Sequence, residues 1–236
     1  MKKMINITAI LLAMMALPAF AHHQKLTQAE IPHEHTYIPK GYDSNDNVEL
    51  IVEGYLPNLC FKTPHTRVDV EGKQINVDLM AWTSEDDGVA CAEMVVPFVH
   101  VFSVGVLDMG NYTVVINGEK TGELFVEESS SSSIDDYIYA NVESIKRIDG
   151  ERSVVLKGHN PSFCLEFDRY EISHNESDVY SIQPIMKQVS DFCPLKMVPF
   201  EIEVAVPKEL KRDKVLLHVR AMNGKSVNRL FYERSH

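Results

Sequence analysis

The sequence predicts an all-β protein built from two tandem β-sandwich domains. The first observation behind this prediction is a period of two in several apolar segments. Residues 74–82 place Ile75, Val77, Leu79 and Ala81 on one face of an extended chain, which is typical of a half-buried strand. Several such strands follow at a spacing of about ten residues, and no amphipathic helix is found beyond the N-terminal segment. That spacing indicates a β-sandwich in each half of the chain.

The second observation is an internal repeat, in which four landmarks recur in the same order 102 to 106 residues further along the chain. The landmarks are two cysteines, a Pro-Phe pair and an Asn-Gly pair. They lie at Cys60, Cys91, Pro97-Phe98 and Asn117-Gly118 in the first copy, and at Cys164, Cys193, Pro199-Phe200 and Asn223-Gly224 in the second. This order indicates a tandem domain repeat. Each Asn-Gly pair also predicts a hairpin, because both residues tolerate the positive φ of a type I′ turn.

The first 21 residues predict export from the cytoplasm. Lys2 and Lys3 precede an apolar run at 5–17, and Ala19-Phe20-Ala21 has the small-x-small form of a cleavage site. This is the organisation of a bacterial secretory signal peptide, and the run is too short for a membrane helix. No cysteine stands directly after the cleavage motif and no later run could cross a bilayer, so neither a lipid anchor nor a membrane span is expected. The mature protein is predicted to be periplasmic or secreted.

Four cysteines in an exported chain predict disulfides rather than free thiols or a zinc site. They allow three pairings, and the repeat selects the one in which Cys60 pairs with Cys91 and Cys164 pairs with Cys193. Each bond would close a loop of about thirty residues, worth roughly 3–4 kcal/mol in the chain-entropy model. The sequence has no CxxC spacing, so a redox-active dithiol is not expected.

Composition divides the chain into five segments. The serine run at 129–133 cannot bury apolar surface, so it predicts a flexible linker. Residues 36–39 are expected to open the first domain, because residues 136–139 stand in the corresponding place before the second. The predicted segments are a signal peptide at 1–21, a histidine-rich tail at 22–35, a first domain at 36–127, the linker at 128–136 and a second domain at 137–236.

One short motif resembles a known family. Leu107, Gly110 and Tyr112 form the L-x-x-G-x-Y pattern that precedes strand F in immunoglobulin-like domains, where the tyrosine hydroxyl bonds back to the backbone. The chain is therefore similar to bacterial tandem immunoglobulin-like secreted domains, and the resemblance implies two immunoglobulin-like sandwiches. No cysteine lies two residues after Tyr112, and residues 210–215 lack both the glycine and the tyrosine. The Cys60–Cys91 bond is accordingly expected at one end of the sandwich, where it ties a loop.

Histidines supply the clearest candidate for metal chemistry. His22, His23, His33 and His35 are close in sequence, and neutral imidazole is a common transition-metal ligand. Cleavage after Ala21 would expose His22, whose α-amine and ring chelate Cu(II) together; copper-oxidising polysaccharide enzymes and periplasmic copper carriers begin in this way. The alternative is a solvated polar tail, and we assign no metal site and no cofactor. No motif selects a second ligand among the remaining candidates, which are His65, His100, His159 and His218.

Catalytic constellations are not recognisable in the sequence. It contains no G-x-S-x-G nucleophile elbow, and its cysteines are assigned to disulfides. The acidic run Glu85-Asp86-Asp87 lies between predicted strands, where a solvated loop is the ordinary interpretation. Trp82 beside this loop is either a ligand anchor or a packed side chain. We therefore predict that the protein is not an enzyme.

Charge excludes one class of partner and leaves three functions open. A formal net charge of −11 gives no electrostatic footprint for nucleic acid or anionic lipid. The leading hypothesis is a non-enzymatic exported protein that binds an unknown protein or surface ligand through its sandwich domains. The alternatives are a periplasmic copper-binding or copper-dependent oxidising protein that uses His22, and a structural or spacer component of an envelope assembly.

Overall fold

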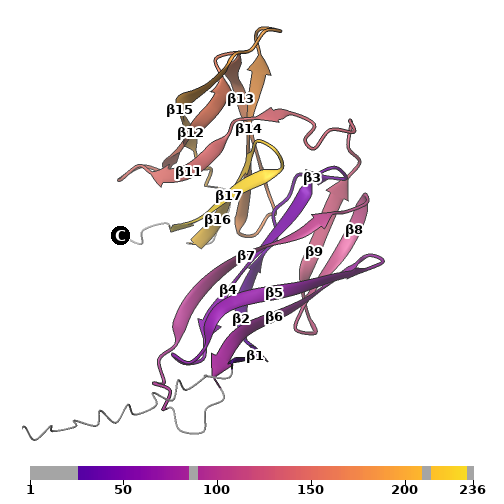
Figure 1. Ribbon diagram of the computed structural model, residues 1–236, viewed down its shortest axis with the longest axis vertical. Helices are drawn as coiled ribbons and strands as arrows, with labels where there is room; N and C mark the ends of the chain where they lie inside the picture. Colours follow the sequence, from indigo (N-terminus) through magenta and orange to yellow (C-terminus); the bar gives the residue numbers. More distant parts are fainter. Residues whose placement is uncertain (1–25, 85–89, 209–213, 233–236) are drawn as a thin grey trace, which may run out of the picture.

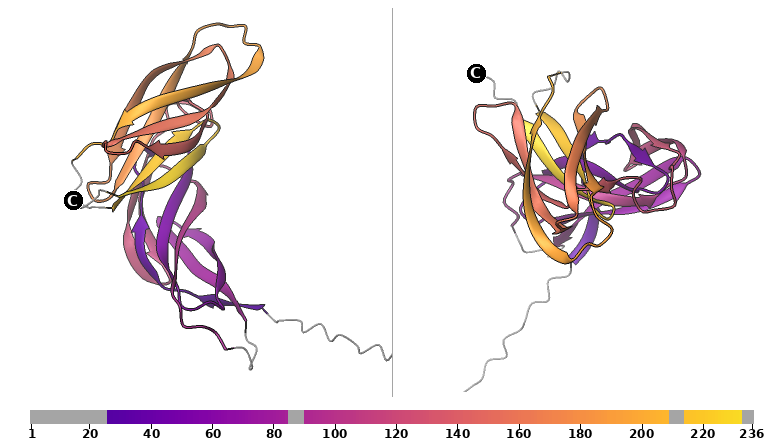
Figure 2. Two further views of the ribbon diagram at one scale, coloured as in Figure 1. Left: turned by 90° about the vertical axis from the view of Figure 1, so that its left-hand side faces the viewer. Right: turned by 90° about the horizontal axis from the view of Figure 1, so that it is seen from above.

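The computed structural model describes residues 26–84, 90–208 and 214–232. Within those ranges the chain is all-β and forms two β-sandwich units that follow one another along the long axis of the molecule (Figures 1 and 2). Each unit contains one disulfide bond. The predicted fold class, all-β with two sandwiches, is therefore confirmed. The described part of the chain contains no helix with the length and apolar character needed to cross a bilayer.

Unit 1 contains the strands β1 (Leu26–Glu30), β2 (His33–Tyr37), β3 (Tyr42–Asp43), β4 (Asn47–Leu56), β5 (Lys62–Glu71), β6 (Gln74–Ser84), β7 (Val96–Val106), β8 (Gly110–Ile116) and β9 (Glu119–Glu127). Its larger sheet has the order β1-β6-β8-β9-β3, with β5 on the other side of β6. Its smaller sheet has the order β2-β4-β7. Most neighbours are antiparallel, but β6 runs parallel to β8 and β3 runs parallel to β9. Neither sheet closes on itself, so each ends in strands that pair on one side only.

Unit 2 contains the strands β10 (Ile138–Tyr139), β11 (Val142–Arg147), β12 (Ser153–Ser162), β13 (Leu165–His174), β14 (Val179–Gln188), β15 (Leu195–Ala205), β16 (Lys214–Ala221) and β17 (Lys225–Tyr232). One sheet has the order β10-β14-β16-β17, with β13 also paired to β14, and the other has the order β11-β12-β15. The parallel pair β14 and β16 corresponds to β6 and β8 of unit 1. The same correspondence makes β15 the counterpart of β7.

The period of two identified in the sequence does define the core. Ile75, Val77, Leu79 and Ala81 of β6 are each at most 2% exposed and pack into the core of unit 1. Burial of such side chains contributes about 25 cal/mol for each Å² of apolar surface removed from water. An equivalent core lies between the two sheets of unit 2, around Leu156. Each unit therefore has a hydrophobic core of its own.

The predicted turns adopt the expected geometry. Asn117 and Gly118 have φ values of 49° and 79° and connect β8 to β9 as a two-residue hairpin. Both angles lie in the left-handed region that a type I′ turn requires. The Tyr112 hydroxyl donates a hydrogen bond of 2.7 Å to the carbonyl oxygen of Asp108. This bond ties the start of β8 to the preceding loop, as the L-x-x-G-x-Y motif predicts.

The prediction of a histidine-rich tail at 22–35 is wrong for residues 26–35. β1 pairs with β6 and β2 pairs with β4, so the first domain begins before residue 36. Ile31 between these strands is 1% exposed. The predicted match between 36–39 and 136–139 is also wrong. β10, at residues 138–139, pairs with β14 in the way that β1 pairs with β6, so β10 corresponds to β1 and not to residues 36–39. The strands form because their backbones complete existing sheets, which side-chain periodicity does not reveal.

The serine-rich linker has no helix or strand, as predicted, but hydrogen bonds fix it to unit 1. The carboxylate of Asp136 accepts a hydrogen bond from the amide of Ser130 at 2.7 Å and one from the side-chain amide of Asn45 at 2.8 Å. Asn45 also donates to the carbonyl oxygen of Ser131. These bonds attach the linker to unit 1. Composition could not predict them, because they depend on acceptors next to the serines and on a donor far away in the sequence.

Candidate protein-binding edge

The structure confirms both predicted disulfides. Cys60 bonds to Cys91 and Cys164 bonds to Cys193, each with 5.6 Å between the Cα atoms. The first bond links the loop after β4 to the loop after β6, at one end of the sandwich, as predicted. The described part of the chain contains no free cysteine. Disulfides persist in oxidising compartments, so the two bonds indicate an extracytoplasmic location.

The candidate histidines that the structure describes do not gather into one cluster of metal ligands. His22 and His23 lie outside the described residues, so the hypothesis that His22 binds copper stays a prediction. His65 stacks on Trp82 at 5.3 Å, whereas His159 pairs with Glu143 at the surface. Over the described ranges, no group of three or more His, Cys, Asp or Glu side chains could hold a metal ion. The acidic run at 85–87 also lies outside the described residues.

The two units share a small apolar cluster, which we call the junction core. It consists of Tyr37 and Ile51 from unit 1 and Val179 and Leu216 from unit 2, each at most 2% exposed. Leu230 of β17 packs against them. A shared core of this kind holds the two sandwiches in one relative orientation, because separating the units would expose all of these side chains to water.

Arg220 of β16 adds a buried cation to the junction. Its guanidinium donates to Asp46 at 2.7 Å and to Asp135 at 3.1 Å. The side chains of Arg220 and Asp46 are only 5% and 1% exposed. The rings of Tyr42 and Tyr139 lie 5.6 and 5.1 Å from the guanidinium carbon. Because Asp46 belongs to unit 1 and Asp135 to the linker, this one cation connects all three parts of the chain.

His218 of β16 lies beside this ion pair and is 1% exposed. Its Nδ1 is 2.8 Å from the side-chain oxygen of Asn228, and its Nε2 is 3.1 Å from the Tyr42 hydroxyl. Burial, together with the nearby charge of Arg220, lowers the pKa of His218 from 6.5 to about 4. The His218 ring is therefore neutral in the folded protein at neutral pH.

The depressed pKa of His218 predicts acid-sensitive stability. The contribution of neutral His218 to the free energy of unfolding is fully present above pH 6.5. It is lost as the pH falls toward 4, because the unfolded state binds the proton first. The loss should reach about 3 kcal/mol, because lowering a pKa by one corresponds to about 1.4 kcal/mol. Urea unfolding at several pH values measures it. His218→Gln should flatten this part of the curve, whereas His159→Gln at the surface should not; equal pH dependence in all three proteins would contradict the assignment.

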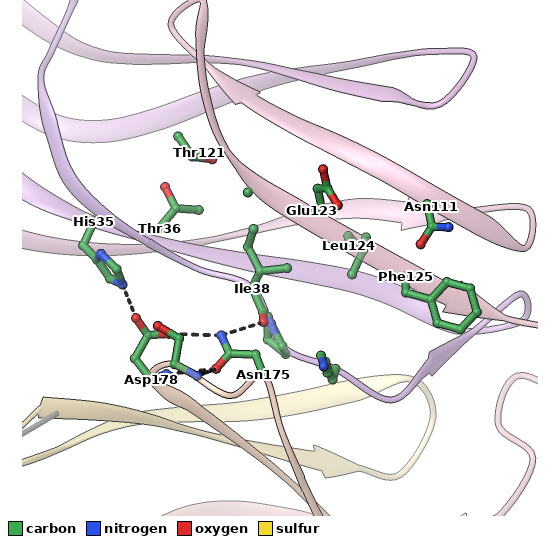
Figure 3. Close-up of a pocket in the computed structure, with 14 residues that line it drawn as sticks. His35, Thr36, Ile38, Asn111, Thr121, Glu123, Leu124, Phe125, Asn175 and Asp178 are labelled. Atoms are coloured by element: carbon green, nitrogen blue, oxygen red, sulfur yellow. Dashed lines mark hydrogen bonds and ion pairs between the residues drawn. The ribbon is translucent and has the colours of Figure 1, made fainter. Parts of the chain in front are cut away.

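A cavity of about 480 Å³ lies between β9 and the turn that joins β13 to β14 (Figure 3). His35 approaches Asp178 across the junction, with 2.5 Å between Nε2 and Oδ2. The side-chain oxygen of Asn175 accepts three backbone N–H groups, and its amide donates to the carbonyl oxygen of Ile38. These polar groups line the cavity and bond to one another at its margin. They stabilise the junction, and we assign no ligand to this site.

The strongest candidate for an interaction surface is the free edge of β7, which runs along one margin of unit 1 (Figure 1). β7 pairs with β4 along its whole length and with no other strand in the described ranges. None of its eleven residues is Asp, Glu, Lys or Arg. On its outer face, Val99 and Val101 are 49% and 41% exposed. An uncharged strand of this length with an open edge is a template for pairing with another chain.

The other long edge strands are protected by charge. β15 is the counterpart of β7 in unit 2, and the repeat offset of 102 residues aligns Val99 and Val101 with Glu201 and Glu203. Glu201 also pairs with Lys157 on the neighbouring strand. β5 and β13, which end the larger sheets, carry acidic and basic residues. Charged side chains are a common device against edge pairing, and β7 lacks it.

The sequence analysis did not identify the edge of β7 as a site. The signal was present in the repeat. When the two copies are aligned on the Pro-Phe pairs, Glu201 and Glu203 stand at the positions of Val99 and Val101. Identifying the edge also required knowledge of which strands have a neighbour on one side only, and strand order depends on contacts distant in sequence.

Comparison with known proteins covers part of unit 1. Residues 50–126 match the family model described as the ORF11 beta-sandwich domain. The match spans β4 to β9 almost completely, so it includes β7 and covers less than half of the chain. No curated protein and no solved structure matches the chain. The family match therefore supports the sandwich fold of unit 1 without adding an activity.

Proposed function

We propose that this protein is a non-enzymatic exported binding protein that takes up an extended segment of another protein at the edge of β7. The observation that carries the proposal is the eleven-residue, charge-free strand that pairs on one side only. Added strands gain main-chain hydrogen bonds along such an edge, and alternate side chains supply specificity. The edge thus offers a general means of binding polypeptide without any catalytic group.

Other features support this proposal. The predicted signal peptide and the two disulfides agree with a periplasmic or secreted protein. The hydrogen bond from Tyr112 to Asp108 supports the resemblance of unit 1 to immunoglobulin-like domains, a scaffold common among binding proteins. The junction core and Arg220 hold unit 2 beside unit 1. Unit 2 therefore keeps a fixed position next to the proposed site.

Site-specific photo-cross-linking in cells that produce the protein tests this function. A benzophenone side chain at position 101 should give a discrete protein adduct, whereas the same group at position 203 on β15 should not. A cross-linker at Ser103 should also give the adduct, and Val99→Glu with Val101→Glu should abolish it by copying the charges of β15. These surface changes should alter stability by no more than about 0.5 kcal/mol each.

Two outcomes would count against the proposed function. One is an equal yield of adducts at positions 101 and 203, which would indicate unspecific contact. The other is an adduct at Ser103 that survives in the folded Val99→Glu, Val101→Glu protein. Thermal unfolding of that variant, monitored by circular dichroism, serves as the control for its fold.

A further inference from the structure

The outer face of the larger sheet in unit 1 places a histidine and a methionine opposite each other. The buried residues of β6 are odd-numbered, so Met80 and Trp82 point outward. His65 of β5 pairs with Met80 in the register of the two antiparallel strands, which lie side by side in Figure 1. Directly opposed residues share one face of a sheet, with about 4.5–5.5 Å between their Cβ atoms. The imidazole of His65 and the thioether of Met80 are therefore neighbours on this face.

A local irregularity of β5 fixes which nitrogen of His65 carries the proton. The register against β6 shifts between Lys62 and His65, and bulges of this kind re-aim the side chains beside them. Within the shift, Thr63 has a φ of 50°, which is unfavourable for a β-branched residue. The carbonyl oxygen of Thr63 lies 3.2 Å from Nδ1 of His65. Because a carbonyl oxygen only accepts hydrogen bonds, Nδ1 is the donor, and Nε2 of the neutral ring presents a lone pair.

The Nε2 atom of His65 is buried and has no hydrogen-bond partner among the described residues. Such an atom is rare in a folded protein and calls for an explanation. The ring is held in place by stacking on Trp82, with 5.3 Å between the ring centroids and 22° between their planes. Its lone pair is shielded from solvent, so it suits a single small ion better than a sugar or a peptide.

We propose that His65 and Met80 bind a soft monovalent metal ion, Cu(I). Thioether sulfur selects Cu(I) over harder ions, and imidazole also binds copper. The ion would give Nε2 the partner that it lacks. A backbone carbonyl on the other ring nitrogen, as Thr63 provides, is the usual means of orienting an imidazole that binds metal.

The surroundings of the site agree with a bound cation. Glu30 of β1 pairs with Met80 from the other side of β6, so a carboxylate lies in the same row of the sheet. Arg67, two residues beyond His65, already pairs with Asp78. The site needs neither His22 nor a partner at β7, so it is a second function beyond the one proposed above.

Titration of the folded, oxidised mature chain with silver nitrate tests the proposal. Ag(I) has the charge and softness of Cu(I) without its redox chemistry, and all four cysteines are in disulfides, so no thiol competes for it. Trp82 is the one tryptophan of the chain and stacks on His65, so its fluorescence reports on the site. We expect saturable quenching by one ion per chain. Cu(I), supplied as its acetonitrile complex without oxygen, should displace the silver.

Variants distinguish this site from other ligands in the chain. Met80→Leu keeps an apolar side chain of similar size but removes the sulfur, and His65→Gln removes the imidazole; each should weaken binding at least tenfold. Met109→Leu, at a side chain that is 57% exposed in the loop before β8, should bind as the wild type does. So should the double variant His22→Gln, His23→Gln. Circular dichroism checks the fold of each variant.

Three results would overturn the proposal. The first is the absence of saturable quenching in the folded wild type. The second is unchanged affinity in the folded Met80→Leu protein, which would show that the sulfur is not a ligand. The third is loss of quenching in the His22→Gln, His23→Gln protein, which would place the ion at the N-terminus.

Discussion

Replacing Arg220 by alanine is expected to lower the free energy of unfolding by about 3 to 5 kcal/mol. Removal of the guanidinium leaves Asp46, whose side chain is 1% exposed, as a buried carboxylate without its cation. It also removes the hydrogen bonds that Arg220 donates to unit 1 and to the linker. We therefore expect lower stability together with loss of coupling between the units.

Urea unfolding followed by two probes measures this coupling. The chain has one tryptophan, Trp82 in unit 1, so its fluorescence reports on that unit alone, whereas far-UV circular dichroism reports on both. In the wild type the two transitions should coincide; in Arg220→Ala they should separate. Coincidence of different probes is the usual test of cooperative unfolding.

Exposed Arg67 provides the matched control for Arg220. It lies 3.4 Å from Asp78, and the two side chains are 69% and 61% exposed. Surface pairs of this kind contribute about 0–1 kcal/mol, so Arg67→Ala should change little. The double variant Asp46→Asn, Arg220→Met should recover much of the loss, since it removes the buried charge together with its partner. An Arg220→Ala protein as stable as the wild type would contradict the role assigned to the junction.

Removing the disulfide of unit 1 is expected to have the second largest effect. Cys60 and Cys91 are 31 residues apart, and opening a loop of that length costs about 3 to 4 kcal/mol through the entropy of the unfolded chain. The Cys60→Ser, Cys91→Ser protein should therefore unfold at lower urea concentration, with Trp82 fluorescence as the probe. The Cys164→Ser, Cys193→Ser protein should lose a similar amount, because its loop spans 29 residues.

The disulfide prediction separates structural bonds from redox-active ones. If each bond is structural, a reductant should lower the stability of the wild type and of each double-serine variant to that of a protein with all four cysteines replaced by serine, and it should leave that four-serine protein unchanged. Stability that is equal in oxidised wild type and in both serine variants would contradict the account. It would mean that the sandwich cores alone hold the loops in place.

Much of the fold follows from local patterns in the sequence. The alternation of apolar residues in β6 predicts its buried face, and the repeated cysteines predict both bonds. The Asn-Gly pair at 117–118 predicts the β8–β9 hairpin, because positive φ is a property of these two residues themselves. Each of these signals lies within a short segment or recurs in both copies of the repeat.

Other features depend on contacts that no local pattern encodes. β5 mixes charged and apolar residues and is exposed along most of its length, so it lacks the period-two signal of a half-buried strand. β1 and β2 are strands because β6 and β4 offer them backbone partners. Arg220 and Asp46 are 174 residues apart, and nothing near either residue predicts the pair. The free edge of β7 likewise follows only from the order of strands in the sheet.

Hydrogen–deuterium exchange on the purified cross-linked complex tests the central claim most directly. If a partner segment adds to the sheet at β7, the amides of residues 96–106 that do not bond to β4 should exchange at least ten times more slowly in the complex than in the free protein. Residues 195–205 of β15 should exchange at the same rate in both. Unchanged exchange at 96–106, or protection confined to another part of the chain, would contradict strand addition at β7.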